Sequence, residues 1–430
     1  MTVLDIYSRI KGNGDILVAL SLSICMVWQL AWLGILLVFL GLLILTSRFK
    51  FVTDSLKAYD QTFLQSSRGQ YFNVRVLYAV LVLLVSLYHR GGFSAAETPA
   101  KCVVLAYIVL NIGKYRWSVL ICGVAAGAVI AAGSAVVDLY VYHAVRPFGL
   151  INPIRLGMIA LTFGAISAVG LVHARSLLMA AVAVAGSTAG FATAFLSGSR
   201  GALLALPFIL LLLAPVLWQR SRRVFAVVSI FLAVFATLML AGNVGGMSTR
   251  IMTATAQVYA TVAGDEKVSD RSVGDRTKLL LLAYRLFKEE PLLGVGTQRW
   301  NAAVAELVNA PEPEDRLVSP YNQAHNQYAD DLAKGGIVRF LLGFLILFMP
   351  LYLFLTREPF SGQSGSEFAL AGVVTSVAYM LFCLSESLMI LSLPAAVQTI
   401  LVFYLLSACD ALRRETQSIP VGPATLKLGI

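Results

Sequence analysis

The chain has 430 residues, of which 58% are hydrophobic and only 13% are charged, and its mean hydropathy is +0.79. A soluble domain of this length would carry far more charge, so the composition excludes an ordinary soluble protein and indicates a membrane protein. The net charge of +10 would suit a nucleic-acid partner, but excess Lys and Arg in a membrane protein are typical of cytoplasmic anchors, and we expect no nucleic-acid binding. The five cysteines form no CxxC or His-linked pattern, which argues against disulfides and structural zinc.

A helix needs about 20 apolar residues to cross the hydrocarbon core of a bilayer, and on this basis we predict an all-α polytopic membrane protein with about twelve transmembrane helices. The candidate spans, in chain order, are residues 16–28, 32–46, 74–88, 100–112, 117–136, 156–172, 177–196, 202–218, 224–241, 337–356, 368–385 and 391–408. The first two stretches are short, and we interpret them as a tight hairpin of two helices. The first is expected to be retained, because no small-residue cleavage site follows it.

The distribution of Lys and Arg gives the predicted orientation. With the N-terminus inside, the cytoplasmic segments collect most of the basic residues that lie outside the spans. The short outer segments hold only Arg90, Lys101, Arg146, Arg155 and Arg200. This is the positive-inside pattern, and merging the first two helices into one would reverse it. We therefore place both termini on the cytoplasmic side.

One connection is too long for a simple turn. Residues 242–336 lie between the ninth and tenth predicted helices, on the outer side of the membrane. The chain is thus expected to divide into nine helices over residues 1–241, an outer loop domain over 242–336, three helices over 337–409 and a cytoplasmic tail over 410–430.

The loop domain is predicted to be partly helical. Residues 275–290 carry apolar side chains at i, i+3, i+4 and i+7, the pattern of a half-buried helix. These are Leu279, Leu282, Ala283 and Leu286. Pro291 and Gly294 are expected to end this helix, and residues 300–308 are predicted to form a second short one. His325 opens a polar helix that leads into the tenth span.

Three outer arginines are candidates for binding an anion. Arg276 lies on the same side of its predicted helix as Ala283, and an arginine directed along a buried face needs an anionic partner or a polar cavity. Arg200 stands in a hairpin so tight that its guanidinium must lie at the outer membrane surface. Arg146 lies in the short outer segment 138–153. The structural alternatives are an ion pair with a loop carboxylate for Arg276 and interfacial anchors for Arg200 and Arg146.

His325 is the candidate for proton transfer, because histidine is the side chain best suited to exchange protons near neutral pH, although a lone surface histidine is usually inert. The outer segments contain no DxD, HExxH or EF-hand spacing. Asp330 and Asp331 are adjacent in a helix and point about 100° apart, which makes a poor metal site. The sequence therefore indicates neither a metal nor another cofactor. ATP is not expected outside the membrane, so any reaction there must use a substrate that is already activated.

Three motifs occur in order over roughly residues 190–350. The first is Ser199-Arg200-Gly201 at an outer hairpin. The second is Gly274-Asp275-Arg276, which opens a helix running into Pro291-Leu292-Leu293-Gly294-Val295-Gly296. The third is His325-Asn326, followed after nine residues by Gly336 at an apolar helix. In their order, spacing and topology the three motifs resemble those of the O-antigen ligase and polymerase superfamily of bacterial envelope glycosyltransferases. The chain departs from that family at Arg339, where a second glycine is frequent, and at Tyr328-Ala329, which replace an apolar pair.

The resemblance implies a function at the outer face of the bacterial inner membrane. The donor would be a glycan on undecaprenyl diphosphate, and a ligase would transfer it to a sugar hydroxyl of lipid A–core with inversion at the anomeric carbon. The implied site consists of His325 as the base and of Arg200, Arg276 and Arg146 on the diphosphate, with Ser199, Gly201 and Asn326 in support. The superfamily also contains polymerases, which commonly have two substantial outer loops, and protein-glycosylating enzymes, which usually carry more outer sequence at the C-terminus. One long loop and a short basic tail favour the ligase, with membrane lipids as its surroundings.

A secondary transporter is the alternative from another class, since about twelve spans with both termini inside would suit one. Transporters need ionisable residues near the midplane for coupling, and the predicted spans are nearly free of them. The exception is Glu386, which we place near the outer turn between the last two helices. Polar residues along a through-path would indicate a transporter, and polar residues gathered at the outer face would indicate a transferase.

Overall fold

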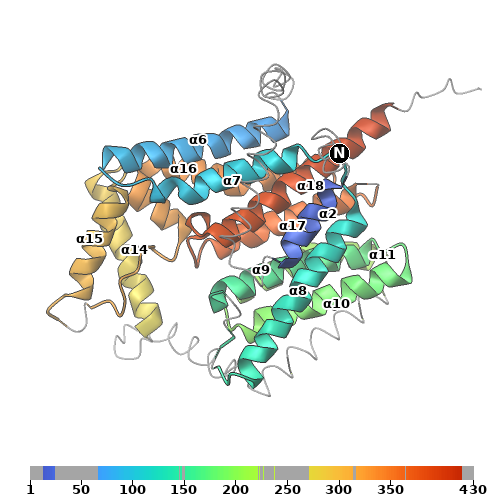
Figure 1. The fold of residues 1–430 in the computed structure, drawn as a ribbon, viewed down its shortest axis with the longest axis horizontal. Coiled ribbons are helices and arrows are strands. Elements are labelled where there is room, and N and C mark those ends of the chain that lie inside the picture. The colour runs from blue at the N-terminus through green and yellow to red at the C-terminus, as the bar shows by residue number, and fades with distance from the viewer. Residues whose placement is uncertain are drawn as a thin grey trace, which may run out of the picture.

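The computed structural model describes residues 13–24, 66–144, 146–147, 151–220, 271–312, 316–363 and 365–418, with three isolated positions between 221 and 240. Over these residues the chain forms helices and no strand, which confirms the all-α prediction (Figure 1). The predicted second span lies outside the described residues, and the predicted ninth span lies almost entirely outside them.

The α-helices of the described residues, in chain order, are α2 (Gly14–Ile24), α6 (Ser67–Tyr88), α7 (Ser94–Leu110), α8 (Trp117–Tyr140), α9 (Pro153–Val172), α10 (Leu177–Leu196), α11 (Arg200–Arg220), α14 (Arg271–Glu289), α15 (Gly296–Val308), α16 (Gln327–Leu355), α17 (Ser366–Phe382) and α18 (Ser392–Ser418). A short 3-10 helix, η3 (Leu388–Ile390), joins α17 to α18. Seven of these helices, α6, α8, α9, α10, α11, α16 and α18, are long and apolar enough to cross a membrane. The chain is therefore a multi-pass membrane protein.

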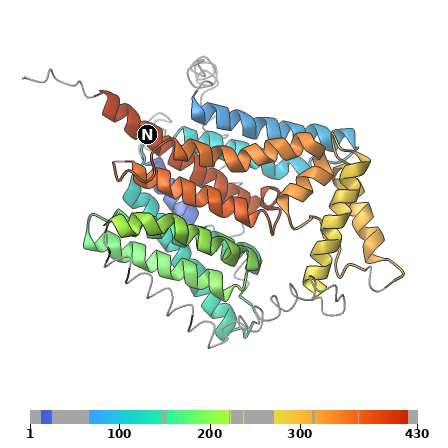
Figure 2. The same ribbon diagram turned by 180° about the vertical axis from the view of Figure 1, so that it is seen from behind.

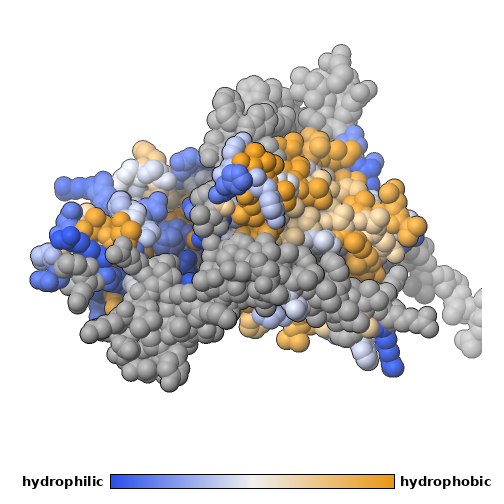
Figure 3. Space-filling view, turned by 90° about the horizontal axis from the view of Figure 1, so that it is seen from below, coloured by the Kyte–Doolittle hydropathy of each residue, from blue (hydrophilic) through white to orange (hydrophobic). Residues whose placement is uncertain are grey.

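The spanning helices lie side by side, and α14 and α15 lie across one end of the bundle (Figures 1 and 2). We call this the loop end. On the face shown in Figure 3, the described surface of the bundle is mainly apolar, whereas most of the described surface around α14 and α15 is hydrophilic. Because successive helices run in opposite directions, the connection between α10 and α11, the start of α16 and the turn after α17 all lie at the loop end.

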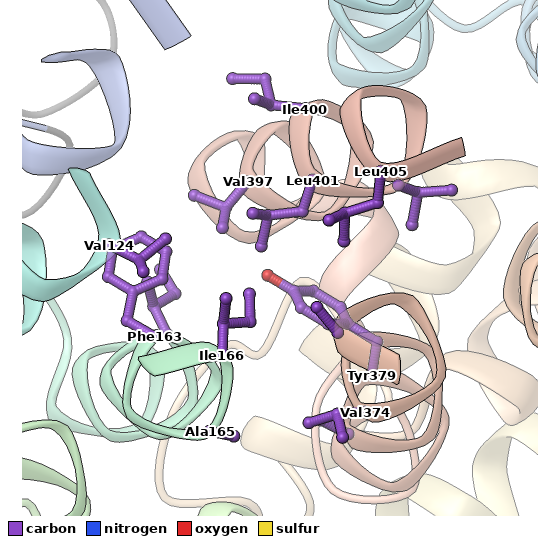
Figure 4. Packing of buried hydrophobic residues seen from close by; sticks show 14 of the residues in the cluster. Val124, Phe163, Ala165, Ile166, Val374, Tyr379, Val397, Ile400, Leu401 and Leu405 are labelled. Atoms are coloured by element: carbon purple, nitrogen blue, oxygen red, sulfur yellow. The ribbon is translucent and has the colours of Figure 1, made fainter. Parts of the chain in front are cut away.

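The bundle is held together by close approach of small residues and by an apolar centre. A Cβ on Gly164 would lie 3.1 Å from the Cα of Gly190, so α9 and α10 approach each other as closely as two backbones allow. In the centre, Ile166 of α9 faces Tyr379 of α17 and Leu401 of α18, whereas Phe163 of α9 packs toward α8, beside Val124 (Figure 4).

The loop-end helices confirm the predicted half-buried helix and extend both predicted segments. α14 ends at Glu289, two residues before Pro291, and α15 begins at Gly296, four residues earlier than predicted. Their shared core contains Leu279, Leu282, Ala283 and Leu286 of α14 and Trp300, Ala303 and Val304 of α15. This small core fixes the rotation of α14 about its own axis, and therefore the direction in which Arg276 points.

The polar helix predicted to lead from His325 into the tenth span is confirmed, beginning at Gln327. α16 runs from Gln327 to Leu355, and its helical conformation is interrupted at Gly336, at φ 62° and ψ −164°, directly before the predicted apolar stretch. Asn326 caps the helix, its side chain accepting a hydrogen bond from the Ala329 amide at 3.0 Å.

The spans also contain more ionisable residues than predicted. Asp331 and Arg339 of α16 are buried, and their side chains pair at 2.8 Å. The hydroxyl of Tyr78 donates to the same oxygen of Asp331 at 2.9 Å. The charge of Arg339 is thus paired inside the protein, which is the condition under which a buried charge is tolerated.

Arg75 is buried within α6, where its guanidinium donates to the Tyr71 hydroxyl at 2.9 Å and to the Gln398 side chain. The cavity beside it, lined in part by Tyr78 and Cys102, has a volume of about 10 Å³, room for a single water. The buried polar groups here therefore bind one another.

Candidate functional site

The first motif forms a tight connection at the loop end. α10 ends at Leu196, and Ser199 caps α11, its hydroxyl accepting from the Ala202 amide at 3.3 Å. A Cβ on Gly201 would overlap the Ser385 hydroxyl in the turn after α17. Ser199 is buried, while Arg200 is exposed at the first position of α11. The two predicted supporting residues therefore fix the connection that presents Arg200.

Arg146 binds this connection from the side. Its Nη2 donates to the carbonyl oxygens of Ser197 at 2.9 Å and Gly198 at 3.3 Å, and its Nε donates to Ser197 at 3.1 Å. The last carbonyls of a helix lack intrahelical donors and carry a partial negative charge, so a guanidinium is a suitable partner. The structure thus gives Arg146 a supporting position against the backbone that leads to Arg200.

Arg276 lies at the edge of the buried face of α14. Ala283, on the same side as Arg276, is buried, and the buried face of α14 is centred on Leu279, Leu282 and Leu286. Arg276 is partly buried. Burial lowers the pKa of its guanidinium, the carboxylate of Glu386 raises it, and the charge of Arg200 lowers it further. These three charged groups, from three separate elements, therefore share one electrostatic environment.

Asp275, quoted in the second motif without a role, ties α14 to the chain before α16. Its buried carboxylate accepts from the Tyr321 hydroxyl at 3.0 Å and from the Val318 amide at 3.3 Å. Burial, together with this hydrogen bond, raises the pKa of Tyr321 to about 12. Tyr321 remains a neutral hydroxyl around neutral pH, and its ring packs edge-to-face against His325 at 5.2 Å between centroids.

His325 lies two residues before α16, in the left-handed region at φ 50°. Its Nδ1 is 3.3 Å from Oε2 of Glu386, and its side chain is 17% exposed. The next residue, Asn326, caps α16 and also donates to the Leu384 carbonyl at 3.1 Å. A side chain in this backbone conformation is strained unless its neighbours hold it, and such residues are frequent at functional sites.

Glu386 lies in the turn between α17 and α18, as expected from the sequence. The sequence did not predict its contact with His325. The carboxylate is buried, and it accepts a hydrogen bond from the Gln323 side chain as well as facing the imidazole. The signal in the sequence was a carboxylate in an apolar region, which needs a partner.

The backbone before His325 is held by a second pair of charges. The carboxylate of Asp330 accepts from the Ala324 amide at 3.0 Å and from the Lys334 ammonium at 2.7 Å. Lys334 also donates to the Asn322 carbonyl at 2.7 Å. The closest cationic partner is Lys334 for Asp330 and Arg339 for Asp331, with Arg339 also 3.9 Å from Asp330. Among the described residues no three His, Cys, Asp or Glu side chains lie close enough to share a metal ion.

The glycines of the second and third motifs meet each other. The amide of Val295 donates to the Ala333 carbonyl, and the amide of Ile337 donates to the Pro291 carbonyl, both at 2.9 Å. Gly294 and Gly336 have positive φ, and a Cβ on either would overlap the backbone of the other segment. The spacing of the motifs therefore reflects one contact, in which the chain after α14 packs on the break in α16.

The fold and this site define a multi-pass membrane protein with a cationic, histidine-containing site at the loop end of its bundle. Residues 185–348 match the family model described as O-antigen ligase, and this range includes Arg200, Arg276 and His325. The match confirms the resemblance to the O-antigen ligase superfamily and supports an enzyme of the ligase or polymerase kind. An uncharacterized protein of Haemophilus influenzae is 19% identical over 322 residues, which cover 73% of this chain and 79% of that protein.

Proposed function

We propose that the protein is a metal-independent, inverting glycosyltransferase that moves a glycan from undecaprenyl diphosphate to lipid A–core. The reaction takes place at the periplasmic face of the inner membrane, with both termini of the chain in the cytoplasm. The observation that carries the proposal is the placement of Arg200 and the partly buried Arg276 beside the His325–Glu386 pair at the loop end.

The arginines suit a diphosphate that is both the handle and the leaving group. A guanidinium binds phosphate oxygens through a planar pair of N–H groups and keeps its proton in proteins. Fixed cations stabilise the charge that develops on a departing diphosphate, and a site sheltered from water strengthens this effect. Arg276 fits this role because burial of its guanidinium lowers its pKa more than the charge of Glu386 raises it. An anion bound beside Arg276 therefore offsets part of the free-energy cost of removing this charge from water.

His325 suits activation of the acceptor. Its ring takes the proton of the acceptor hydroxyl while that oxygen attacks the anomeric carbon, and the bond from this carbon to the diphosphate oxygen breaks on the opposite face. The product is the glycosylated acceptor, the lipid diphosphate departs with the bonding electron pair, and the imidazolium afterwards returns its proton to water. Both substrates are lipids held in one plane, which removes much of the entropy cost of bringing them together.

A polymerase of the same superfamily uses the same donor and differs in its acceptor, which is a second lipid-linked glycan. The single long outer loop predicted from the sequence favours the ligase. The deciding experiment is transfer by purified protein in liposomes with lipid-linked glycan as the donor and either lipid A–core or further lipid-linked glycan as the acceptor. Transfer to lipid A–core is expected, and chain extension alone would show a polymerase.

Arg276→Lys is expected to reduce transfer nearly as much as Arg276→Ala. Lysine keeps the positive charge but loses the bidentate geometry, so a site that depends on geometry loses most of its function in both variants. Arg200→Lys should behave in the same way. The measurement is the transfer rate of reconstituted protein at matched expression.

Arg285→Lys is the matched control, because Arg285 is exposed on the same helix and should tolerate the change. If the lysine variants at positions 200 and 276 both transfer at the wild-type rate, these arginines are anchors and the diphosphate binds elsewhere.

Transfer is expected to continue in excess EDTA. The outer segments lack metal-binding spacings, and in the proposed site the arginines supply the positive charge that a divalent ion would otherwise supply. The check is the rate of purified protein after chelation and after adding back magnesium or manganese. Loss of activity with EDTA and recovery with either metal would refute metal-independent transfer.

A further inference from the structure

The Glu386 carboxylate is enclosed and has both oxygens engaged. It is 2% exposed, Oε1 accepts from the Gln323 side chain, and Oε2 faces Nδ1 of His325 at 3.3 Å. Its own amide donates to the Phe382 carbonyl at 3.0 Å, which fixes the turn after α17. The carboxylate therefore has a set direction, and its second oxygen points at one nitrogen of the imidazole.

The other charged and titratable groups around the pair come from three elements. Arg276 of α14 and Arg200 of α11 supply positive charge, and Tyr321 packs its ring against the imidazole. Asp275 is engaged with the Tyr321 hydroxyl, and Asp330 is engaged with Lys334. Among the described residues, Glu386 is thus the carboxylate that faces His325.

We propose that Glu386 is a positioning residue that holds His325 with its proton on Nδ1 and leaves Nε2 as the base. This inference rests on the proposed function. An ionised carboxylate only accepts hydrogen bonds, so the nitrogen that faces it carries the proton. A neutral imidazole has one N–H, and its other nitrogen is consequently free to accept.

The same carboxylate acts during the reaction. When Nε2 takes the proton of the acceptor hydroxyl, the ring becomes an imidazolium beside the ionised Glu386, and the carboxylate stabilises this charge without taking up a proton itself. The Gln323 side chain keeps the carboxylate from turning away, and the two arginines stay directed to the diphosphate. The arrangement separates activation of the acceptor from binding of the leaving group.

Glu386→Gln tests the proposal with little change in size. The rate of transfer at saturating substrates is expected to fall by about 10²-fold or more, because the ring loses its preferred tautomer. In the same variant the imidazole should no longer hold its proton on Nδ1 alone, because a glutamine amide can either donate to or accept from the ring nitrogen. Glu386→Asp should recover part of the rate.

Glu367→Gln is the matched control. Glu367 lies at the other end of α17, is also poorly exposed, and accepts from the Gly365 amide at 2.9 Å, far along the helix from His325. This variant should leave the rate and the tautomer of His325 unchanged. If Glu386→Gln lowers the rate while the ring still carries its proton on Nδ1 alone, its role is structural and the proposal is overturned.

A second measurement needs no variant at Glu386. Nitrogen NMR of histidine-labelled wild-type protein, with His325→Gln to assign the signal, should show Nδ1 protonated and Nε2 unprotonated above neutral pH. A proton on Nε2 would overturn the proposal even if the enzyme transfers glycan. An active His325→Ala enzyme would instead remove the proposed function, so the two failures are distinguishable.

Discussion

Replacing His325 by alanine is expected to lower the transfer rate by about 10²–10⁴-fold, the usual loss when a general base is removed. Binding of the lipid-linked donor should be largely retained, because Arg200 and Arg276 are placed to hold its diphosphate. The wild-type rate should itself fall as the medium is made acidic, since an imidazolium cannot accept a proton. The measurements are single-turnover transfer and donor binding across a range of pH.

His143→Ala is the control for this prediction. His143 also has a positive φ, at 50°, but it is exposed in the segment between α8 and α9. Its loss should change the rate little. If the His325→Ala protein remains active with an unchanged pH profile, another group activates the acceptor, and the buried Glu386 is the first to test.

Gly336→Ala is expected to be the most damaging single-methyl change in the described part of the chain. Gly336 occupies a region of φ and ψ that other residues avoid, at a cost of about 1–3 kcal/mol, and its new Cβ would overlap the carbonyl of Leu292. Relief of the overlap would separate the chain after α14 from α16 and so move Arg276 relative to His325. The thermal midpoint and the transfer rate should both fall.

Gly133→Ala provides the comparison. Gly133 lies within α8, and a Cβ there would meet nothing within 4 Å, so alanine should be neutral or slightly stabilising. A Gly336→Ala protein with wild-type stability and activity would show that the contact between the two motifs is not needed to assemble the site.

Hydrophobicity was sufficient to predict most of the described bundle, because each spanning helix needs an apolar stretch of its own. The polar helix before the tenth span was also predicted, but its ion pairs were not. Within this helix Asp330 pairs with Lys334, and Asp331 pairs with Arg339. Hydropathy counts each charge singly, so it does not show which charges pair inside the folded protein.

The candidate site was predicted residue by residue but not as an arrangement. Arg200, Arg276 and His325 were found through motifs, and the structure gathers them at one end of the bundle. The contact between His325 and Glu386 joins residues 61 positions apart, and the contact of Arg146 with Ser197 joins residues 51 apart. Nothing local in the sequence encodes such pairs, so the direction of each side chain became apparent only in three dimensions.

The proposed site is divided between two parts of the molecule. Arg276 and Asp275 belong to the helices that lie across the loop end, whereas Arg200 and Glu386 belong to the spanning bundle. A donor whose diphosphate binds both arginines would bridge the loop-end helices and the spanning bundle. Part of its binding free energy would then stabilise the alignment of these two parts. By thermodynamic linkage, a ligand or lipid that stabilises the aligned arrangement raises the affinity of the protein for the donor. The bound donor raises the affinity for that ligand by the same factor.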